Sequence, residues 1–234
     1  MTYSVQYTLK NKDVNLYRKL RTSALFEFLQ EASIAHTEML GMGREMTLDR
    51  GFLWVVLQQR IDITRMPEYG ETVTVETWPG TTMHVLFPRY YQIRDPEGNV
   101  LMNGSAVWAL VDTDTRRMIF PDRNGILIEG ETTGRETGLP LPLKREETDR
   151  QDLYTVQFCD CDLNGHMNNT RYFDLCENLL EHPAQGKDPV TITAEYVQEA
   201  RFRETVTVKY AEDENRAVLY GETGKTCFRM RLDY

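Results

Sequence analysis

The chain has 234 residues, of which 41% are hydrophobic and 27% charged, and its formal net charge is −9. This is the composition of a soluble globular protein, long enough for one large domain or two smaller ones. The acidic balance argues against nucleic acid and anionic membranes as partners, because such binding depends on clustered Lys and Arg. No apolar run approaches the roughly 20 residues that cross a bilayer. Residues 1–20 lack the pattern of a secretory signal, so we expect a cytoplasmic protein.

Four cysteines are too few and too clustered for a secreted disulfide scaffold. Three of them, Cys159, Cys161 and Cys176, could ligate zinc together with His166, but the paired Cys-x-x-Cys knuckle of structural zinc sites is missing. We therefore expect reduced thiols, no metal and no cofactor.

The first half of the chain predicts a strand, a long helix and then several strands. Residues 3–9 alternate in polarity as a strand does. From Thr22, apolar residues recur at steps of three and four as far as Met39, and Gly41 stands where a C-terminal cap belongs. The apolar stripe of this helix is broad, so another element should wrap it. Strands that could do so are predicted at 52–64, 71–78, 84–94 and 100–111.

The second half repeats this order in shortened form after a stretch rich in Gly and Pro, which we interpret as a linker crossing a surface. The sequence Glu-Thr-Val-Thr-Val occurs at 71–75 and again at 204–208, which supports an internal duplication. We expect an α+β fold with a sheet curled around a helix, formed twice, in residues 1–130 and 151–234 with a linker at 131–150. The second half predicts a helix at 168–180 and strands at 152–158, 190–198, 204–211, 216–222 and 225–232.

The stretch from Cys159 to Tyr172 concentrates carboxylates, amides and an imidazole ahead of the second helix. In an extended segment, alternate side chains share a face, so Asp162, Asn164 and His166 could point into one cavity. A structural interpretation is that the Asn-rich turn merely caps the helix through Asn168 or Asn169. The number of groups with distinct chemical properties favours a reactive site instead.

Several stretches in chain order resemble the acyl-acyl-carrier-protein thioesterases, the double hot-dog enzymes of plant plastids and some bacteria. These stretches are Leu-Trp-Val-Val at 53–56, the strand at 73–78, Ser-Ala-Val-Trp at 105–108, Asp-Thr-Arg-Arg-Met at 114–118, residues 160–172 and Glu-Tyr-Val-Gln-Glu at 195–199. The resemblance implies two hot-dog halves, each a sheet wrapped on a central helix. It also implies a bacterial, cytoplasmic hydrolase that releases free fatty acid from acyl-carrier protein.

The resemblance further implies that Asp162, Asn164 and His166 are catalytic and that Glu199 joins them from a neighbouring strand. Plant members commonly carry cysteine directly after that glutamate, whereas this chain has Ala200, which favours water as the attacking species. We expect Glu199 to be the general base, although His166 or Asp162 could also accept the proton.

The expected supporting roles follow from the groups themselves. Asn164 would fix His166 in one tautomer, and Asp162 would orient Asn164 or the water. The backbone amides of Gly165, His166 and Met167, at the start of a helix, are candidate donors to the oxyanion.

The resemblance places the acyl chain in the first half, where Met39, Phe52, Trp54 and Trp108 are candidate contacts. Core packing would also explain any one of them. Because carrier protein is acidic, a basic rim near the cavity should bind it, and Arg171, Arg201 and Arg203 lie closest in sequence to the predicted site. Two alternatives are an acyl-CoA thioesterase on the same scaffold and a non-catalytic acyl-binding regulator. Monomer and homodimer are both compatible with two hot dogs in one chain.

Overall fold

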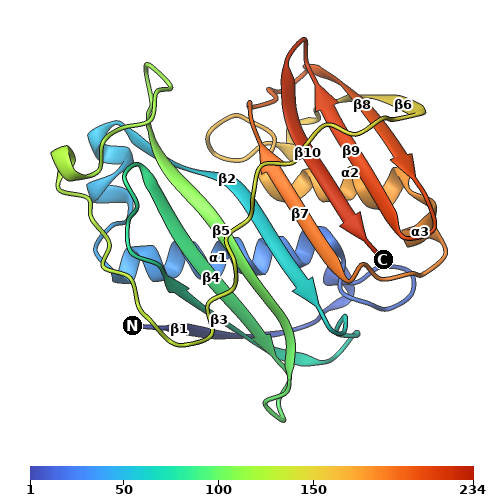
Figure 1. Cartoon of the computed structure of the whole chain (residues 1–234), viewed down its shortest axis with the longest axis horizontal. Coiled ribbons are helices and arrows are strands. Elements are labelled where there is room, and N and C mark those ends of the chain that lie inside the picture. The colour runs from blue at the N-terminus through green and yellow to red at the C-terminus, as the bar shows by residue number, and fades with distance from the viewer.

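Ten strands form one continuous antiparallel sheet in the computed structural model, which describes residues 1–234. The strand order across the sheet is β1-β3-β4-β5-β2-β7-β10-β9-β8-β6 (Figure 1). The strands of the first half are β1 Tyr3–Thr8, β2 Phe52–Ile63, β3 Thr72–Pro79, β4 Leu86–Arg94 and β5 Val100–Asp112. Those of the second half are β6 Arg150–Thr155, β7 Thr191–Tyr196, β8 Thr205–Glu212, β9 Arg216–Glu222 and β10 Thr226–Asp233.

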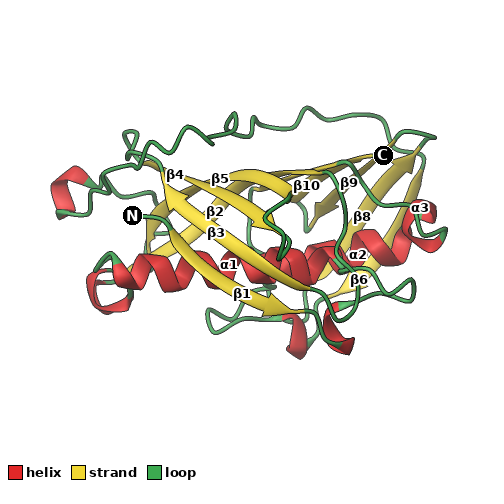
Figure 2. Ribbon diagram, turned by 90° about the horizontal axis from the view of Figure 1, so that it is seen from below, coloured by secondary structure: helices red, strands yellow, loops and turns green.

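The helices lie together on one face of the sheet (Figure 2). They are α1 Thr22–Met39, α2 Tyr172–Leu179 and the short α3 Glu181–Ala184. The apolar stripe predicted for α1 is buried at Leu25, Phe28, Leu29 and Ala32, and Gly41 follows the helix with φ 71°. None of the helices has the length and apolar content that a membrane span needs.

Each half has the same internal strand order, which confirms the predicted double hot-dog architecture. In the first half this order is β1-β3-β4-β5-β2, and in the second it is β6-β8-β9-β10-β7. The halves join where β2 pairs with β7, from Gln58 opposite Glu195 to Asp62 opposite Thr191. The helices meet beneath this junction, because the rings of Phe26 in α1 and Phe173 in α2 stack with centroids 3.9 Å apart.

The repeated pentapeptide occupies equivalent places in the two halves. It leads into β3 in one half and β8 in the other, and each strand pairs with the first strand of its own half. The hydroxyls of Thr8 and Thr72 are 2.8 Å apart, and those of Thr155 and Thr205 are 3.3 Å apart. The short identity thus marks a structural repeat.

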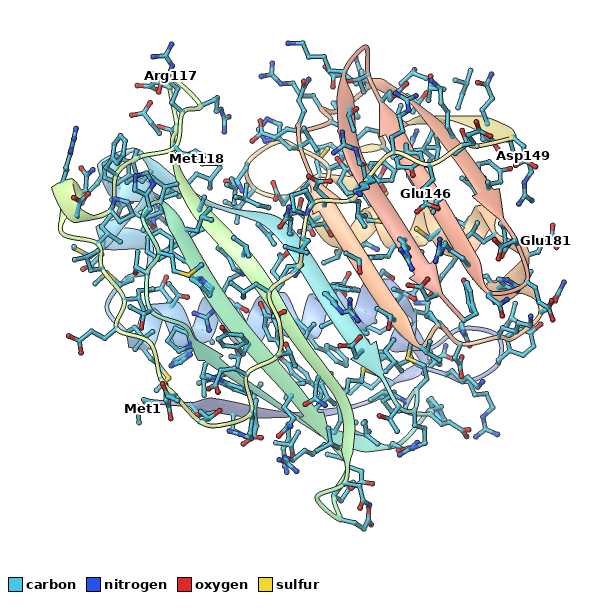
Figure 3. The ribbon with its side chains drawn as sticks, in the orientation of Figure 1. Met1, Arg117, Met118, Glu146, Asp149 and Glu181 are labelled. Carbon is cyan, nitrogen blue, oxygen red and sulfur yellow. The ribbon has the colours of Figure 1, made fainter.

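The segment between β5 and β6 crosses the sheet on the face away from the helices (Figure 2). Its contacts reach both halves: Ser105 Oγ donates to the Gly138 carbonyl at 2.8 Å, and the Glu146 amide donates to the Tyr220 hydroxyl at 2.7 Å. Figure 3 places Glu146 over the strands of the second half. This course agrees with a linker that crosses a surface; the domain limits 1–130, 131–150 and 151–234 stay a prediction.

Candidate active site

The reactive segment is a tight turn rather than the extended segment that would place alternate side chains on one face. The Asp162 amide donates to the His166 carbonyl at 2.9 Å, and the Gly165 amide donates to the Asp162 carbonyl at 3.0 Å. Gly165 has φ 78°, a conformation that a residue with a Cβ rarely adopts. The Asp162 carboxylate accepts the Asn164 amide at 2.8 Å and fixes the turn from inside.

The turn is docked on the residues that follow β7, and this docking brings the two ends of the site together. The Met167 amide donates to the Ala200 carbonyl at 2.8 Å, beside a bridge between His166 and Arg201. As a result His166 Nε2 lies 3.0 Å from Glu199 Oε2. Glu199 stands past the end of β7, which finishes at Tyr196, and not within a strand as expected.

A cavity of about 620 Å³ receives all four predicted polar side chains, Asp162, Asn164, His166 and Glu199. It lies between the two halves, because β2 and the loop after β5 form one side and the second half forms the other. His166 is 8% exposed at its wall, so the imidazole is largely shielded from bulk water. The apolar lining includes Leu53, Val55, Val56, Leu57, Val111, Met118, Met167, Tyr172, Tyr196 and Val197.

Asn164 contacts Asp162 and not His166. Its side-chain nitrogen lies 3.4 Å from the Asp162 Oδ2 that accepts from it, and no hydrogen bond joins Asn164 to the imidazole. The expectation that Asn164 fixes the tautomer of His166 is therefore wrong for this structure, because the turn directs the amide back to the carboxylate. The expected contact between Asp162 and Asn164 is present.

The expected oxyanion donors are only partly free. The amides of Gly165 and Met167 already donate to the carbonyls of Asp162 and Ala200, so these two expectations are corrected. Of the three predicted amides, only that of His166 has no acceptor within the protein. The reason is that the Gly165 amide closes the turn and the Met167 amide holds the turn against the segment after β7.

A second cavity of about 340 Å³ adjoins the first on the side of α1. Both cavities are lined by Leu53, Trp54, Asp162, Asn164 and Asn169. Three predicted acyl contacts, Phe52, Trp54 and Trp108, line the second cavity, together with Phe87 and the buried Arg89.

The fourth predicted contact, Met39, lines neither cavity. Its side chain is 60% exposed, because Met39 is the last residue of α1 and points to solvent, whereas the neighbouring Thr37 and Glu38 line the second cavity. Its assignment to the acyl pocket is therefore wrong.

Neither Cys161 nor Cys176 is prepared to act as a nucleophile. Burial, with the nearby carboxylates of Asp160 and Asp162, raises the pKa of Cys161, and burial raises the pKa of Cys176. A raised pKa leaves little thiolate at neutral pH. Ala200 is fully buried.

Two further residues of the site were not singled out from the sequence. Arg116, on the loop after β5, lines the larger cavity, and its Nη1 donates to Glu199 Oε1 at 3.2 Å. Asn169, considered only as a helix cap, lines both cavities, while Asn168 supplies the cap by accepting the Thr170 amide. The stretch Asp-Thr-Arg-Arg-Met was a signal for Arg116, but nothing local showed that it faces a residue 83 positions away.

Comparison with known protein families matches the acyl-ACP thioesterase N-terminal domain over residues 1–120 and the acyl-ACP thioesterase C-terminal domain over residues 143–227. Among curated proteins, the chain is similar to a chloroplastic acyl-[acyl-carrier-protein] hydrolase of Cuphea viscosissima, with 25% identity over 94% of this chain and 58% of that one. The chain spans between about half and two thirds of the length of such plant relatives.

Two solved structures share the fold over nearly the whole chain. A Lactobacillus plantarum protein described as an oleoyl thioesterase has a TM-score of 0.83 and 27% identity, covering 99% of this chain and 95% of its own. The 12:0-ACP thioesterase of Umbellularia californica has a TM-score of 0.82 and 22% identity, covering 99% and 96%.

Proposed function

Because this chain belongs to the acyl-ACP thioesterase family, we propose that it hydrolyses the thioester of fatty acyl-acyl-carrier protein and releases free fatty acid. The observation that carries the proposal is the 3.0 Å approach of His166 Nε2 to Glu199 Oε2 at the wall of a cavity that adjoins a second, partly apolar one. A general base must lie within hydrogen-bond reach of the proton that it removes, and both groups face the space where a water would sit.

In the proposed reaction, Glu199 accepts a proton from water while the water oxygen attacks the thioester carbonyl carbon. The tetrahedral oxyanion is stabilised by the free amide of His166 and by the side-chain amide of Asn169 or Asn164 at the junction of the cavities. The intermediate then collapses, the carbon–sulfur bond breaks, and the proton held by Glu199 passes to the leaving thiolate. The products are a fatty acid and the carrier's free thiol.

The acyl chain is proposed to enter the 340 Å³ cavity past Trp54, leaving the larger cavity for the pantetheine arm and the attacking water. This assignment is supported by His166 and Glu199, which line only the larger cavity, while the aromatic residues Phe52, Phe87 and Trp108 line only the smaller one. A cytoplasmic location, and a monomer or homodimer, complete the proposal; light scattering in solution decides between the two oligomeric states.

The decisive experiment is turnover of one acyl group on carrier protein and on CoA by the wild type and by Glu199→Gln. We expect preference for carrier protein, and a fall in kcat of about 10²–10⁴-fold in the variant with binding of a non-hydrolysable acyl-pantetheine analogue retained. The remote substitution Glu97→Gln, in the turn between β4 and β5, serves as the matched control. Near-normal turnover by Glu199→Gln would refute its role as the base, and equal turnover of both thioesters would refute carrier-protein selectivity.

A further inference from the structure

Arg116 is placed by a loop whose shape is fixed independently of the active site. The Asp112 carboxylate at the end of β5 accepts the Thr115 amide at 2.7 Å and the Thr115 hydroxyl at 2.8 Å. These hydrogen bonds lower the pKa of Asp112, so the turn is held by an ionised carboxylate at neutral pH. The labels of Arg117 and Met118 mark this loop at the top of Figure 3.

The backbone of Arg116 has φ 57°, in the left-handed region that side chains other than glycine rarely occupy. Its amide donates to the Asp112 carbonyl at 2.9 Å, so the conformation is imposed by the turn. Residues held in this region cluster where function sets the position of a side chain.

The guanidinium group of Arg116 reaches from the first half of the chain to Glu199 in the second. Its Nη1 lies 3.2 Å from Glu199 Oε1, while His166 Nε2 lies 3.0 Å from Oε2. Each carboxylate oxygen thus has one cationic or imidazole neighbour, and the two neighbours come from different halves. A carboxylate held at both oxygens cannot rotate freely about its terminal bond, and its remaining lone pairs stay available to water.

We propose that Arg116 is a positioning residue that orients the Glu199 carboxylate for proton transfer, so that the site is complete only when both halves are present. This inference rests on the proposed function. A surface ion pair of this exposure, with side chains 40% and 33% accessible, contributes little to folding. Its effect on geometry is what turnover would detect.

The test compares Arg116→Gln, Arg116→Lys and the neighbouring Arg117→Gln. Arg117 is on the same loop and carries the same charge, but no carboxylate lies within 4.0 Å of it and it lines neither cavity. We expect kcat to fall about 10- to 100-fold in Arg116→Gln with KM little changed, because misplacing a catalytic group acts on the chemical step. Arg116→Lys should recover part of the loss, and Arg117→Gln should match the wild type.

A second comparison places Arg116→Gln in the Glu199→Gln background, where we expect no further loss. A twofold or smaller effect of Arg116→Gln, a loss confined to KM, or a full additional loss in the double variant would each overturn the inference. Near-normal turnover by Glu199→Gln would instead overturn the proposed function, so the two failures are distinguishable. Unfolding temperatures show whether each variant folds. If Arg116→Gln does not fold, the kcat and KM of Arg116→Lys test the inference in its place.

Discussion

Lys19 occupies in the first half of the chain the position that His166 occupies in the second. The Asn15 amide donates to the Lys19 carbonyl at 2.8 Å, as the Asp162 amide does to that of His166 at 2.9 Å. The next residue in each case, Leu20 or Met167, donates its amide at 2.8 Å to the chain segment alongside. The active-site turn therefore has a duplicate with the same backbone hydrogen bonds.

The duplicate lacks the groups for catalysis and is closed by the other half. The Leu20 amide donates to the Pro67 carbonyl as the Met167 amide donates to that of Ala200. The residue before Pro67, Met66, therefore corresponds to Glu199, and it is buried in the core. Lys19 Nζ forms an ion pair with Asp188 Oδ2 at 2.6 Å, and the Tyr17 hydroxyl donates to the Ala184 carbonyl. One of the two equivalent turns carries the proposed catalytic groups, and the other links the two halves.

Removing the ion pair between Lys19 and Asp188 should reduce the stability of the fold without reducing turnover. We expect Lys19→Met to lower the free energy of unfolding by about 1 kcal/mol, the upper range for a partly exposed ion pair, with kcat unchanged. Urea denaturation and a turnover assay measure the two effects, and Lys225→Met at an exposed turn is the control. A large loss of turnover with intact folding would show that the duplicate turn has kept a role in the reaction.

Protonation of His36 should destabilise the protein below neutral pH. His36 is 1% exposed, and its Nδ1 lies 3.2 Å from Arg89 Nη1. Because arginine only donates, Nδ1 must accept and the ring is neutral. Burial and the charge of Arg89 lower the pKa of His36 to about 4.

In the unfolded chain His36 binds a proton at its ordinary pKa of about 6.5, whereas in the folded chain it binds one only at about pH 4. Stability is thus retained above the unfolded pKa and is lost as pH falls between the two values, by on the order of 3 kcal/mol. His36→Gln should flatten this part of the curve measured by denaturation at several pH values, whereas His84→Asn at the surface should leave it unchanged. An unaltered slope in His36→Gln would contradict the assignment.

Enlarging the second, smaller cavity should shift the released fatty acids to longer chains. Phe87 is 4% exposed and lines the 340 Å³ cavity, so Phe87→Leu opens space at its wall. Phe26→Leu is the control, because Phe26 is also buried but lines neither cavity. Both variants should lose about 1 kcal/mol of stability, and only the first should change the products measured by mass spectrometry. A shift in both, or in neither, would count against this cavity as the acyl site.

Reversing a charge at the cavity mouth should weaken use of the carrier protein. Of the three predicted docking residues, Arg171 is already paired with Asp174 and Glu27, whereas the guanidinium groups of Arg201 and Arg203 have no carboxylate oxygen within 4.0 Å. Arg201 also lines the larger cavity. We expect Arg201→Glu to lower kcat/KM for acyl-carrier protein by about tenfold at low salt, with a smaller effect at high salt and on acyl-CoA. Equal losses on both substrates would show that Arg201 acts on the chemistry and not on docking.

The sequence by itself determined the elements, the duplication and the identity of the polar groups. Periods of two and 3.6 residues are local properties, so the helix from Thr22 and the strands were predicted to within a few residues of their observed ends. The resemblance to a family directed attention to Asp162, Asn164, His166 and Glu199, which the structure brings into one cavity.

Only the tertiary structure decided how these groups meet. The backbone amides of Gly165 and Met167 are used by the turn and its docking, Asn164 contacts Asp162, and the side chain of Met39 is exposed to solvent. Arg116 reaches Glu199 because β2 and β7 pair and so join the two halves into one sheet. The physical reason is that strand register and turn conformation depend on partners far away in the chain, whereas polarity patterns record only whether each residue faces the core or the solvent.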